Sequence, residues 1–317
     1  MNNADKTPSP AVKPQSKPMN LKRSLWRLWH NNESLRGYVL LLPVLLFMFF
    51  MLMVALVTLV VQSFWADTSP GATVQYTLAN YSLLLTPQGE IYRALLLRSL
   101  WMSLLITVSV ILFCYPVAYV LAFHIRRHKI FWLIVITLPF WASYLLRVFS
   151  WKVILQHDGV LNSILMALGL IDQPLGIFLH NRSAVIVTLT HAWAAFAILP
   201  IYVSLEKIDR SMLEAASDLG DGVMRRFWRI TLPLSMPGVL GAVLLLFIRN
   251  VGDYVSPALV GGVSGTMLGN IIVSLFTEMG NEPLAAAVSI TMMVSITLVV
   301  CVFVLLIGGR KRLEGVT

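Results

Sequence analysis

Charged residues are scarce in this 317-residue chain. Asp, Glu, Lys and Arg make up 12% of it, and hydrophobic residues make up 57%. Soluble domains average about a quarter charged residues, so this scarcity excludes an ordinary water-soluble protein. The only two cysteines, Cys114 and Cys301, each lie inside an apolar run, and they predict neither a disulfide framework nor a metal pair. The six histidines have no ligand-like spacing either. We therefore expect no metal site.

Catalytic motifs are missing as well. The sequence contains no Gly-x-x-x-x-Gly-Lys-Ser/Thr phosphate loop, no His-Glu-x-x-His and no nucleophile elbow. The chain is therefore not expected to be an enzyme, to hydrolyse ATP or to bind a cofactor by itself.

Long apolar segments are what the chain has instead. A helix needs about 20 apolar residues to cross a bilayer. Six stretches qualify, at about 37–61, 99–124, 130–149, 183–205, 237–259 and 284–307. Pro116 is expected to bend the second and Pro200 to interrupt the fourth, and the third contains Pro139. The pattern predicts an all-α integral membrane protein with six transmembrane helices.

The segments between the spans are polar or rich in turn residues. Residues 1–20 are rich in Pro, Lys, Ser and Asn, which is typical of a disordered tail. Basic residues alternate with Trp and Leu over 21–36, which indicates an amphipathic helix on the inner membrane face. A cleavable signal peptide is not expected. Residues 67–97, 152–182 and 261–282 are predicted connections.

The distribution of positive charge predicts the orientation. Of the 24 Lys and Arg residues, 18 lie before the first span, after the second, after the fourth or after the sixth. The positive-inside rule then places both termini and the loop after the fourth span in the cytoplasm. The formal net charge of +9 is thus explained by membrane topology, and no nucleic-acid partner is expected.

The loop after the fourth span has its own helix signals. Asp209 and Ser211 are N-cap candidates, and Gly220 is suited to end the short helix that follows them. A second helical run, 223–230, carries three arginines, and Pro233 is expected to turn the backbone. Two short helices with a glycine between them are therefore predicted at the membrane surface.

The same loop resembles a known motif. Glu214-Ala215-Ala216, Gly220 four residues further on, and Ile230-Thr231-Leu232-Pro233 are similar to the "EAA" loop of ABC importer permeases. In that family the loop docks into a groove on the ATPase subunit. The resemblance implies that the ATPase-coupling residues are Glu214, Ala215, Ala216, Asp218, Leu219, Gly220 and Pro233. The alternative is an amphipathic loop helix that lies on lipid headgroups.

This resemblance implies a fold, a location and partners. The fold would be the type I ABC importer transmembrane domain, a multi-pass subunit of the bacterial inner membrane. The partners would be a second, homologous permease, a dimer of ABC ATPase subunits that holds ATP and Mg, a periplasmic substrate-binding protein, and membrane lipid. The chain would divide into a cytoplasmic segment 1–36, a first span and periplasmic loop 37–94, a permease core 95–309 with its coupling loop 206–236, and a cytoplasmic tail 310–317.

Two polar groups are candidates for the substrate path, because charge inside a membrane is costly and rarely faces lipid. Arg249 and Asp253 stand four apart in the fifth predicted span and would share a helix face, near Asn250 and Tyr254. They form either a structural ion pair, or a site in which Asp253 faces the path.

The second polar group lies near the outer end of the third predicted span and contains Ser143, Tyr144, Arg147 and Trp151. Its basic and aromatic side chains either snorkel to the membrane interface or form an outer gate or docking surface.

A narrower resemblance concerns the cargo. Residues 138–151, 158–162, 251–262 and 267–272 are similar to spermidine/putrescine permeases of the B/H type. This implies a polyamine as the imported solute. The sequence departs from that pattern at Ile248-Arg249-Asn250, because a fixed cation beside the path would repel a polyamine unless Asp253 neutralises it. An opine, aminoethylphosphonate or another amino-acid-like solute is the alternative cargo.

Two other classes of protein remain as alternatives. One is a secondary transporter driven by an ion gradient, although such proteins usually show inverted repeats that are not visible in this sequence. The other is a membrane scaffold or enzyme with no transport role.

Overall fold

The described part of the chain is helical. The computed structural model describes residues 33–66, 75–125, 127–178 and 180–314, so the predicted tail and most of the predicted amphipathic segment lie outside the described residues. The chain divides into two compact units after Thr58. The helices are α2 (Glu33–Ser63), α3 (Ala79–Leu85), η1 (Pro87–Gly89), α4 (Glu90–Tyr119), η2 (Val120–His124), α5 (Lys129–Thr137), η3 (Leu138–Trp141), α6 (Tyr144–Leu155), α7 (Val160–Ala167), η4 (Gly176–Phe178), α8 (Arg182–Ala192), α9 (Ala194–Glu206), α10 (Arg210–Asp218), α11 (Val223–Arg226), η5 (Phe227–Thr231), α12 (Leu232–Val251), η6 (Pro257–Gly261), α13 (Gly262–Gly265), α14 (Leu268–Thr277) and α15 (Glu282–Glu314).

Four helical runs are long and apolar enough to cross a membrane. They are Gly37–Ser63, Pro87–His124, Val223–Val251 and Glu282–Ile307. Three further helix pairs pass the same test but are bent, by 84° between α5–η3 and α6–α7, by 47° between α8 and α9, and by 109° between η6–α13 and α14. Length and composition thus allow four to seven spans among the described residues. The six-span topology stays a prediction.

The third and fourth predicted spans are not continuous helices. In the third, Pro139 lies in the tight 3-10 turn η3, and the chain leaves helical geometry at Ala142, where ψ is 150°. In the fourth, the prediction that Pro200 interrupts the helix is wrong, because Pro200 lies inside α9. The break is at Trp193, whose φ and ψ are −107° and 6°.

The fifth predicted span is displaced toward the N-terminus. The predicted range was 237–259, whereas the helical run covers Val223–Val251. The turn expected at Pro233 is absent, because a π-helical turn, η5, directly precedes α12, and its wider winding accommodates a proline that has no N–H to donate. The predicted connections 67–97 and 261–282 also contain helix, including α3 and α14.

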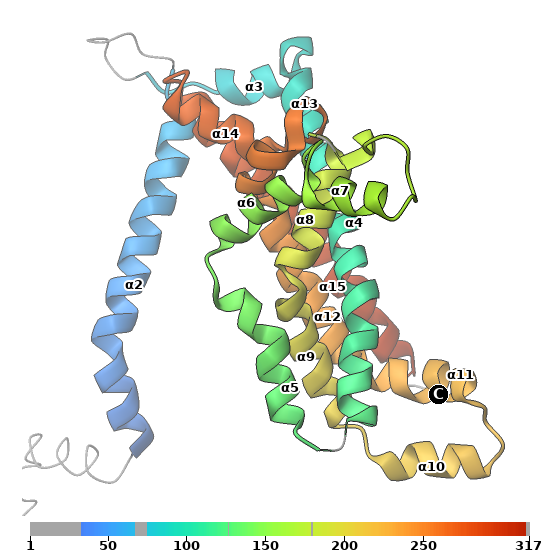
Figure 1. The fold of residues 1–317 in the computed structure, drawn as a ribbon. Coiled ribbons are helices and arrows are strands. Elements are labelled where there is room, and N and C mark those ends of the chain that lie inside the picture. Colours follow the sequence, from blue (N-terminus) through green and yellow to red (C-terminus); the bar gives the residue numbers. More distant parts are fainter. Residues whose placement is uncertain (1–32, 67–74, 126, 179, 315–317) are drawn as a thin grey trace, which may run out of the picture. The chain divides into compact units, whose positions relative to one another are not determined.

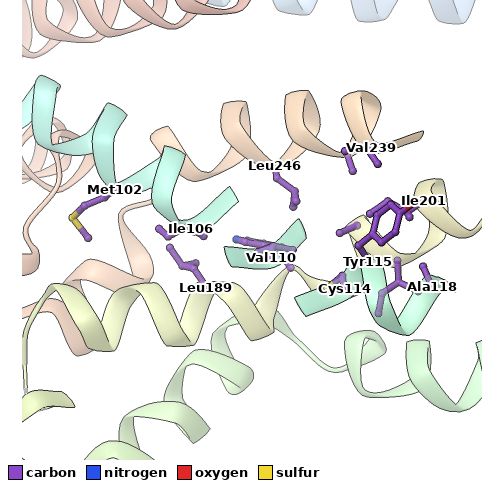
Figure 2. Close-up of a cluster of buried hydrophobic side chains, with 14 of the residues drawn as sticks. Met102, Ile106, Val110, Cys114, Tyr115, Ala118, Leu189, Ile201, Val239 and Leu246 are labelled. Carbon is purple, nitrogen blue, oxygen red and sulfur yellow. The ribbon is translucent and has the colours of Figure 1, made fainter. Parts of the chain in front are cut away.

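The main core lies where α4, α8, α9 and α12 meet, and Figure 2 shows part of it. Its side chains are mostly aliphatic and fully buried, as Ile106, Leu189 and Leu246 are. Between helices in lipid there is no hydrophobic driving force, so close van der Waals packing stabilises such contacts. α10 and α11 lie at one end of this bundle, and α3, α13 and α14 lie at the other (Figure 1).

Gly238 sets the distance between α12 and α9. A Cβ added there would lie 2.5 Å from the Ser204 Cβ and against the carbonyl oxygen of Pro200. The N–H of Gly238 also donates to Ser204 Oγ at 3.2 Å. A glycine allows two backbones to approach this closely, as small residues commonly do in membrane helix pairs.

We therefore expect Gly238→Ala to destabilise the protein by about 1–3 kcal/mol, the usual cost of overpacking a core. The matched control is Gly241→Ala, one turn along the same helix, where a Cβ meets nothing within 4 Å. Thermal unfolding in detergent measures both variants. Equal melting temperatures for the two would contradict this account of the α9–α12 contact.

Candidate functional site

Three helix breaks meet at one place in the fold. Tyr144 begins α6 just after the first break, Trp193 lies between α8 and α9, and Asp253 follows the end of α12. The Tyr144 ring stacks on Trp193, with ring centres 4.7 Å apart and planes inclined by 18°. Its hydroxyl lies 2.8 Å from Asp253 Oδ2. Non-helical backbone at membrane depth is tolerated where it is buried in protein or lines a cavity, which makes this place a candidate substrate path.

We call these side chains, with Arg249 and Ser256, the breakpoint cluster. Asp253 is 8% exposed and accepts hydrogen bonds from neutral groups, namely the Tyr144 hydroxyl, the N–H of Val255 at 3.2 Å, and Ser256. The Ser256 hydroxyl lies 2.8 Å from the Tyr144 oxygen and joins the same hydrogen-bonded group. The carboxylate is thus hydrogen-bonded without a cation.

Of the two alternatives for Arg249 and Asp253, the structural ion pair is not formed. Among the described residues, no Lys, Arg or His nitrogen lies within 4.0 Å of the Asp253 carboxylate. The two residues do not share a helix face, because α12 ends at Val251 and Asp253 lies beyond it. The guanidinium carbon of Arg249 instead lies 3.8 Å from the centre of the Trp193 ring and 5.5 Å from that of Phe196.

The other predicted path residues on this side differ in their surroundings. Asn250 is fully buried, and neither polar atom of its side chain has a hydrogen-bond partner among the described residues. Tyr254 is 47% exposed, and its backbone carbonyl accepts from Asn270 Nδ2 at 2.8 Å. Tyr254 is therefore accessible at the surface of the chain, whereas Asn250 is not.

The second predicted polar group contains two side chains that donate hydrogen bonds from α6 to the end of α8. Arg147 donates to the carbonyl of Ala192 at 3.1 Å, in the last turn of α8. The Trp151 indole donates to His191 Nδ1 at 3.0 Å. Ser143 is the exposed N-cap residue of α6 and has no side-chain capping bond. Arg147 and Trp151 thus support the breakpoint cluster from one side.

Sequence reasoning missed Trp193 and Ser256. Trp193 is 2% exposed and touches both Tyr144 and Arg249, so it is the centre of the cluster. Tryptophan is not a helix breaker, and no local signal marks position 193 as a break. A bulky aromatic in an otherwise small-residue stretch, Ala192–Ala195, is the one hint available.

The predicted coupling loop forms a second candidate site at the other end of the bundle. Asp209 caps α10 by accepting from the N–H of Ser211 at 3.0 Å, and this bond holds the pKa of Asp209 below its usual range. The Asp209 carboxylate therefore stays charged at pH values above that lowered pKa, and its stabilising effect on α10 is lost when the pH falls through it. Glu214, Ala215 and Asp218 are exposed on α10, whereas Ala216 is buried.

Short contacts hold α10 against α11. Arg226 Nη1 donates to the carbonyl of Leu213 at 3.3 Å. Asp221 lies between the helices and pairs with Arg225 at 3.3 Å and with Arg229 at 3.6 Å. Leu219, at the turn, is 87% exposed, so an apolar tip projects from a charged pair of helices. Pro233 is exposed too, but on α12.

The backbone carbonyl of Ala122 connects this loop to the helix bundle through hydrogen bonds. Lys129 Nζ and Arg210 Nη2 both donate to the carbonyl oxygen of Ala122, each at 3.2 Å. Lys129 also pairs with Glu206 at 2.7 Å. The ends of η2 and α9 and the starts of α5 and α10 therefore meet at one joint, which we call the Ala122 joint.

Gly220 allows the loop to reverse direction. Its φ is +86°, and a Cβ there would meet nothing within 4 Å, so only the backbone angle opposes a side chain. We expect Gly220→Asn to be tolerated and Gly220→Val to destabilise the loop by about 1–2 kcal/mol or more, because left-handed backbone is least accessible to β-branched residues. Limited proteolysis of the loop measures this. Equal cleavage rates for Asn and Val would contradict the prediction.

No group of three or more His, Cys, Asp or Glu side chains in the described ranges could hold a metal ion.

Comparisons with known proteins agree with this architecture. The family model described as binding-protein-dependent transport system inner membrane component matches residues 36–312. The chain is 36% identical to the spermidine/putrescine transport system permease protein PotB of Salmonella typhimurium strain SL1344, over 75% of this chain and 81% of that protein. It is 31% identical to the inner membrane ABC transporter permease protein YdcU of Escherichia coli K12, over 85% and 89%.

The fold also has a counterpart among solved structures. A bacterial ABC transporter involved in the import of the acidic polysaccharide alginate superposes with a TM-score of 0.64. The alignment covers 92% of this chain and 99% of that one, at 19% sequence identity, and thus concerns the fold alone.

Proposed function

Since the chain belongs to the family of binding-protein-dependent transport system inner membrane components, we propose that its cargo is a small organic cation of the polyamine type. As a member of this family, the chain is a multi-pass inner-membrane permease subunit of an ABC importer. Beyond this role, we propose the class of solute, the site that binds the solute, and the partner subunits with which the chain moves it from the periplasm to the cytoplasm.

The Asp253 carboxylate carries the proposal about cargo. It is nearly buried and is hydrogen-bonded by neutral groups, and no cation of the described chain pairs with it. An unpaired charge in a medium of low dielectric attracts an opposite charge strongly. The ammonium group of a passing solute would supply it, and nearby aromatic faces at Tyr144 and Tyr254 favour cations further. The polyamine name of the relative at 36% identity supports the same cargo.

The exposed end of α10 supports the proposal about energy coupling. Glu214 and Ala215 are accessible, and Leu219 projects from the loop, as a surface that docks on another protein would require. We infer that this loop faces the cytoplasm together with both termini and contacts a dimer of ATPase subunits. Those subunits would hold ATP and Mg, and this chain would bind no cofactor. A second, homologous permease and a periplasmic binding protein would complete the importer.

The Ala122 joint could transmit a displacement of α10 to the membrane-spanning helices. Arg210 begins α10, and its hydrogen bond to Ala122 ties that helix to the end of the second helical run. Lys129 ties the same carbonyl to Glu206 at the end of α9. A displacement of α10 by the ATPase would therefore move the ends of both runs together.

A zwitterionic, amino-acid-like solute is the second candidate cargo. The observation that favours it is Arg249, which is exposed and makes no ion pair among the described residues. A solute with both charges would satisfy Asp253 and Arg249 at once.

Charge reversal at Glu214 tests the coupling proposal. We expect Glu214→Lys to abolish uptake, because it places a cation where the docking face has its exposed carboxylate, while Glu214→Gln keeps partial activity. The measurement is uptake by cells together with co-purification of the ATPase. Met212→Lys is the matched control, because it also places a lysine on this helix, two residues away and on its other side. Loss of uptake in both Lys variants, or in neither, would contradict the assignment.

Neutralising Asp253 tests the cargo proposal. We expect Asp253→Asn to lower putrescine uptake at least tenfold, since the near-isosteric amide removes the charge. Its oxygen can still accept from the N–H of Val255, and its NH2 can donate to the Tyr144 oxygen in place of the bond that the hydroxyl donates now. Co-purification of the ATPase should not change. Asp172→Asn serves as the control, because Asp172 is exposed and lies in the connection after α7. Normal putrescine uptake by Asp253→Asn would contradict the assignment of Asp253 as the cation site. Loss of only zwitterion uptake would favour the second cargo.

A further inference from the structure

Trp193 is held between two groups of the breakpoint cluster. The Arg249 guanidinium carbon lies 3.8 Å from the centre of its ring, and the Tyr144 ring lies 4.7 Å away at an inclination of 18°. Two flat groups at these heights do not fit on one face of an indole. They therefore cover opposite faces, and the three side chains form a stack from the arginine to the tyrosine that binds Asp253.

This stack separates the two charges of the cluster. Arg249 precedes Asp253 by only four residues, and its side chain is the nearest long cation on the same stretch of chain. The two nevertheless form no ion pair. A guanidinium is planar and weakly hydrated, so it stacks on an aromatic face much better than an ammonium does. Phe196, with its ring centre 5.5 Å from Arg249, adds a second aromatic surface.

We propose that Trp193 determines the specificity of the site by holding the Arg249 guanidinium away from Asp253, which leaves the carboxylate free for a cationic solute. This inference rests on the proposed function and deepens it. Trp193 would act on the solute only through Arg249 and Tyr144, so it is a positioning residue.

The proposal explains how this chain combines a fixed cation with a cationic cargo. Without the indole, Arg249 would be free to turn toward the carboxylate and neutralise it, as a permanent competitor for the solute. With the indole in place, the arginine stays at the surface of the chain, where it is exposed. The same residue also stacks on Tyr144 and so orients the hydroxyl that binds Asp253.

The test uses the complete importer, co-purified with its partner subunits and reconstituted in liposomes, with radiolabelled putrescine as the probe. We expect Trp193→Leu to lower putrescine uptake at least tenfold, and Trp193→Phe, which keeps an aromatic face, to lower it less. The decisive variant is Trp193→Leu combined with Arg249→Met. Removing the released cation should raise uptake at least fivefold above that of Trp193→Leu alone.

A purely structural role for the indole makes the opposite prediction. If Trp193→Leu simply damaged the fold, the second substitution would not restore uptake, and that result would overturn the proposal. Normal uptake by Trp193→Leu would overturn it as well. The KM for putrescine-loaded binding protein and the ATPase rate, measured in parallel, show whether the loss lies in passage of the solute or in docking and hydrolysis.

A second pair of variants leaves the buried indole untouched. Arg249→Lys keeps the charge but stacks poorly, whereas Arg249→Met removes the charge. We expect lower putrescine uptake with lysine than with methionine, and the reverse order would overturn the proposal. These outcomes are separable from failure of the proposed function. If the wild-type importer moved no organic cation, the cargo would be wrong. If wild type imported putrescine and Asp253→Asn did not, while the double variant showed no rescue, only the role of Trp193 would be wrong.

Discussion

Backbone hydrogen bonding inside the membrane is the constraint on which this structure depends. Lipid offers no partner to a free N–H or C=O, so every break in a helix needs protein groups to replace the missing bonds. The structure supplies them from side chains. Arg147 donates to the carbonyl of Ala192 at the end of α8, and Asn270 donates to that of Tyr254. Ser99 accepts from the N–H of Leu268 at the start of α14, at 2.8 Å.

This constraint accounts for the position of the candidate substrate path. Polar side chains must gather wherever spans are broken, and three breaks bring Tyr144, Trp193 and Asp253 together. Of these three side chains, only that of Asp253 bonds to the backbone, by accepting from the N–H of Val255. The side chains that replace lost helix bonds are therefore mostly different residues from those of the breakpoint cluster, but both sets lie at the helix breaks. The tightly packed contact between α9 and α12 at Gly238 holds two of these elements in register.

The sequence predicted the broad architecture well, because hydropathy and local capping rules act over a few residues. The apolar runs indicated a helical membrane protein, and Asp209 and Gly220 marked the helices of the coupling loop. The breaks were harder to place, since they are decided by tertiary packing. Pro200 and Pro233 are strong local signals, but neighbouring turns accommodate both of them within helices. Trp193 carries no such signal and nevertheless ends α8.

The same distinction applies to the candidate sites. Asp253 was found from its charge alone, since an acidic residue in an apolar segment is conspicuous. The expected helix face shared with Arg249 was wrong, because the helix was assumed to continue past Val251. Because α12 ends two residues before Asp253, the carboxylate has other neighbours than a continuous helix would give it. The two short helices of the predicted coupling loop were located well, because they form from nearby contacts, while the coupling role of the loop stays a prediction.

The Ala122 joint has a consequence for how the sequence can vary. Its acceptor is a main-chain oxygen, which no substitution at position 122 can delete, while both donors are side chains of other elements. Substitutions can therefore weaken this connection only at Lys129 and Arg210, and when one donor is lost the carbonyl still accepts from the other. We expect a single substitution to weaken the Ala122 joint without abolishing it.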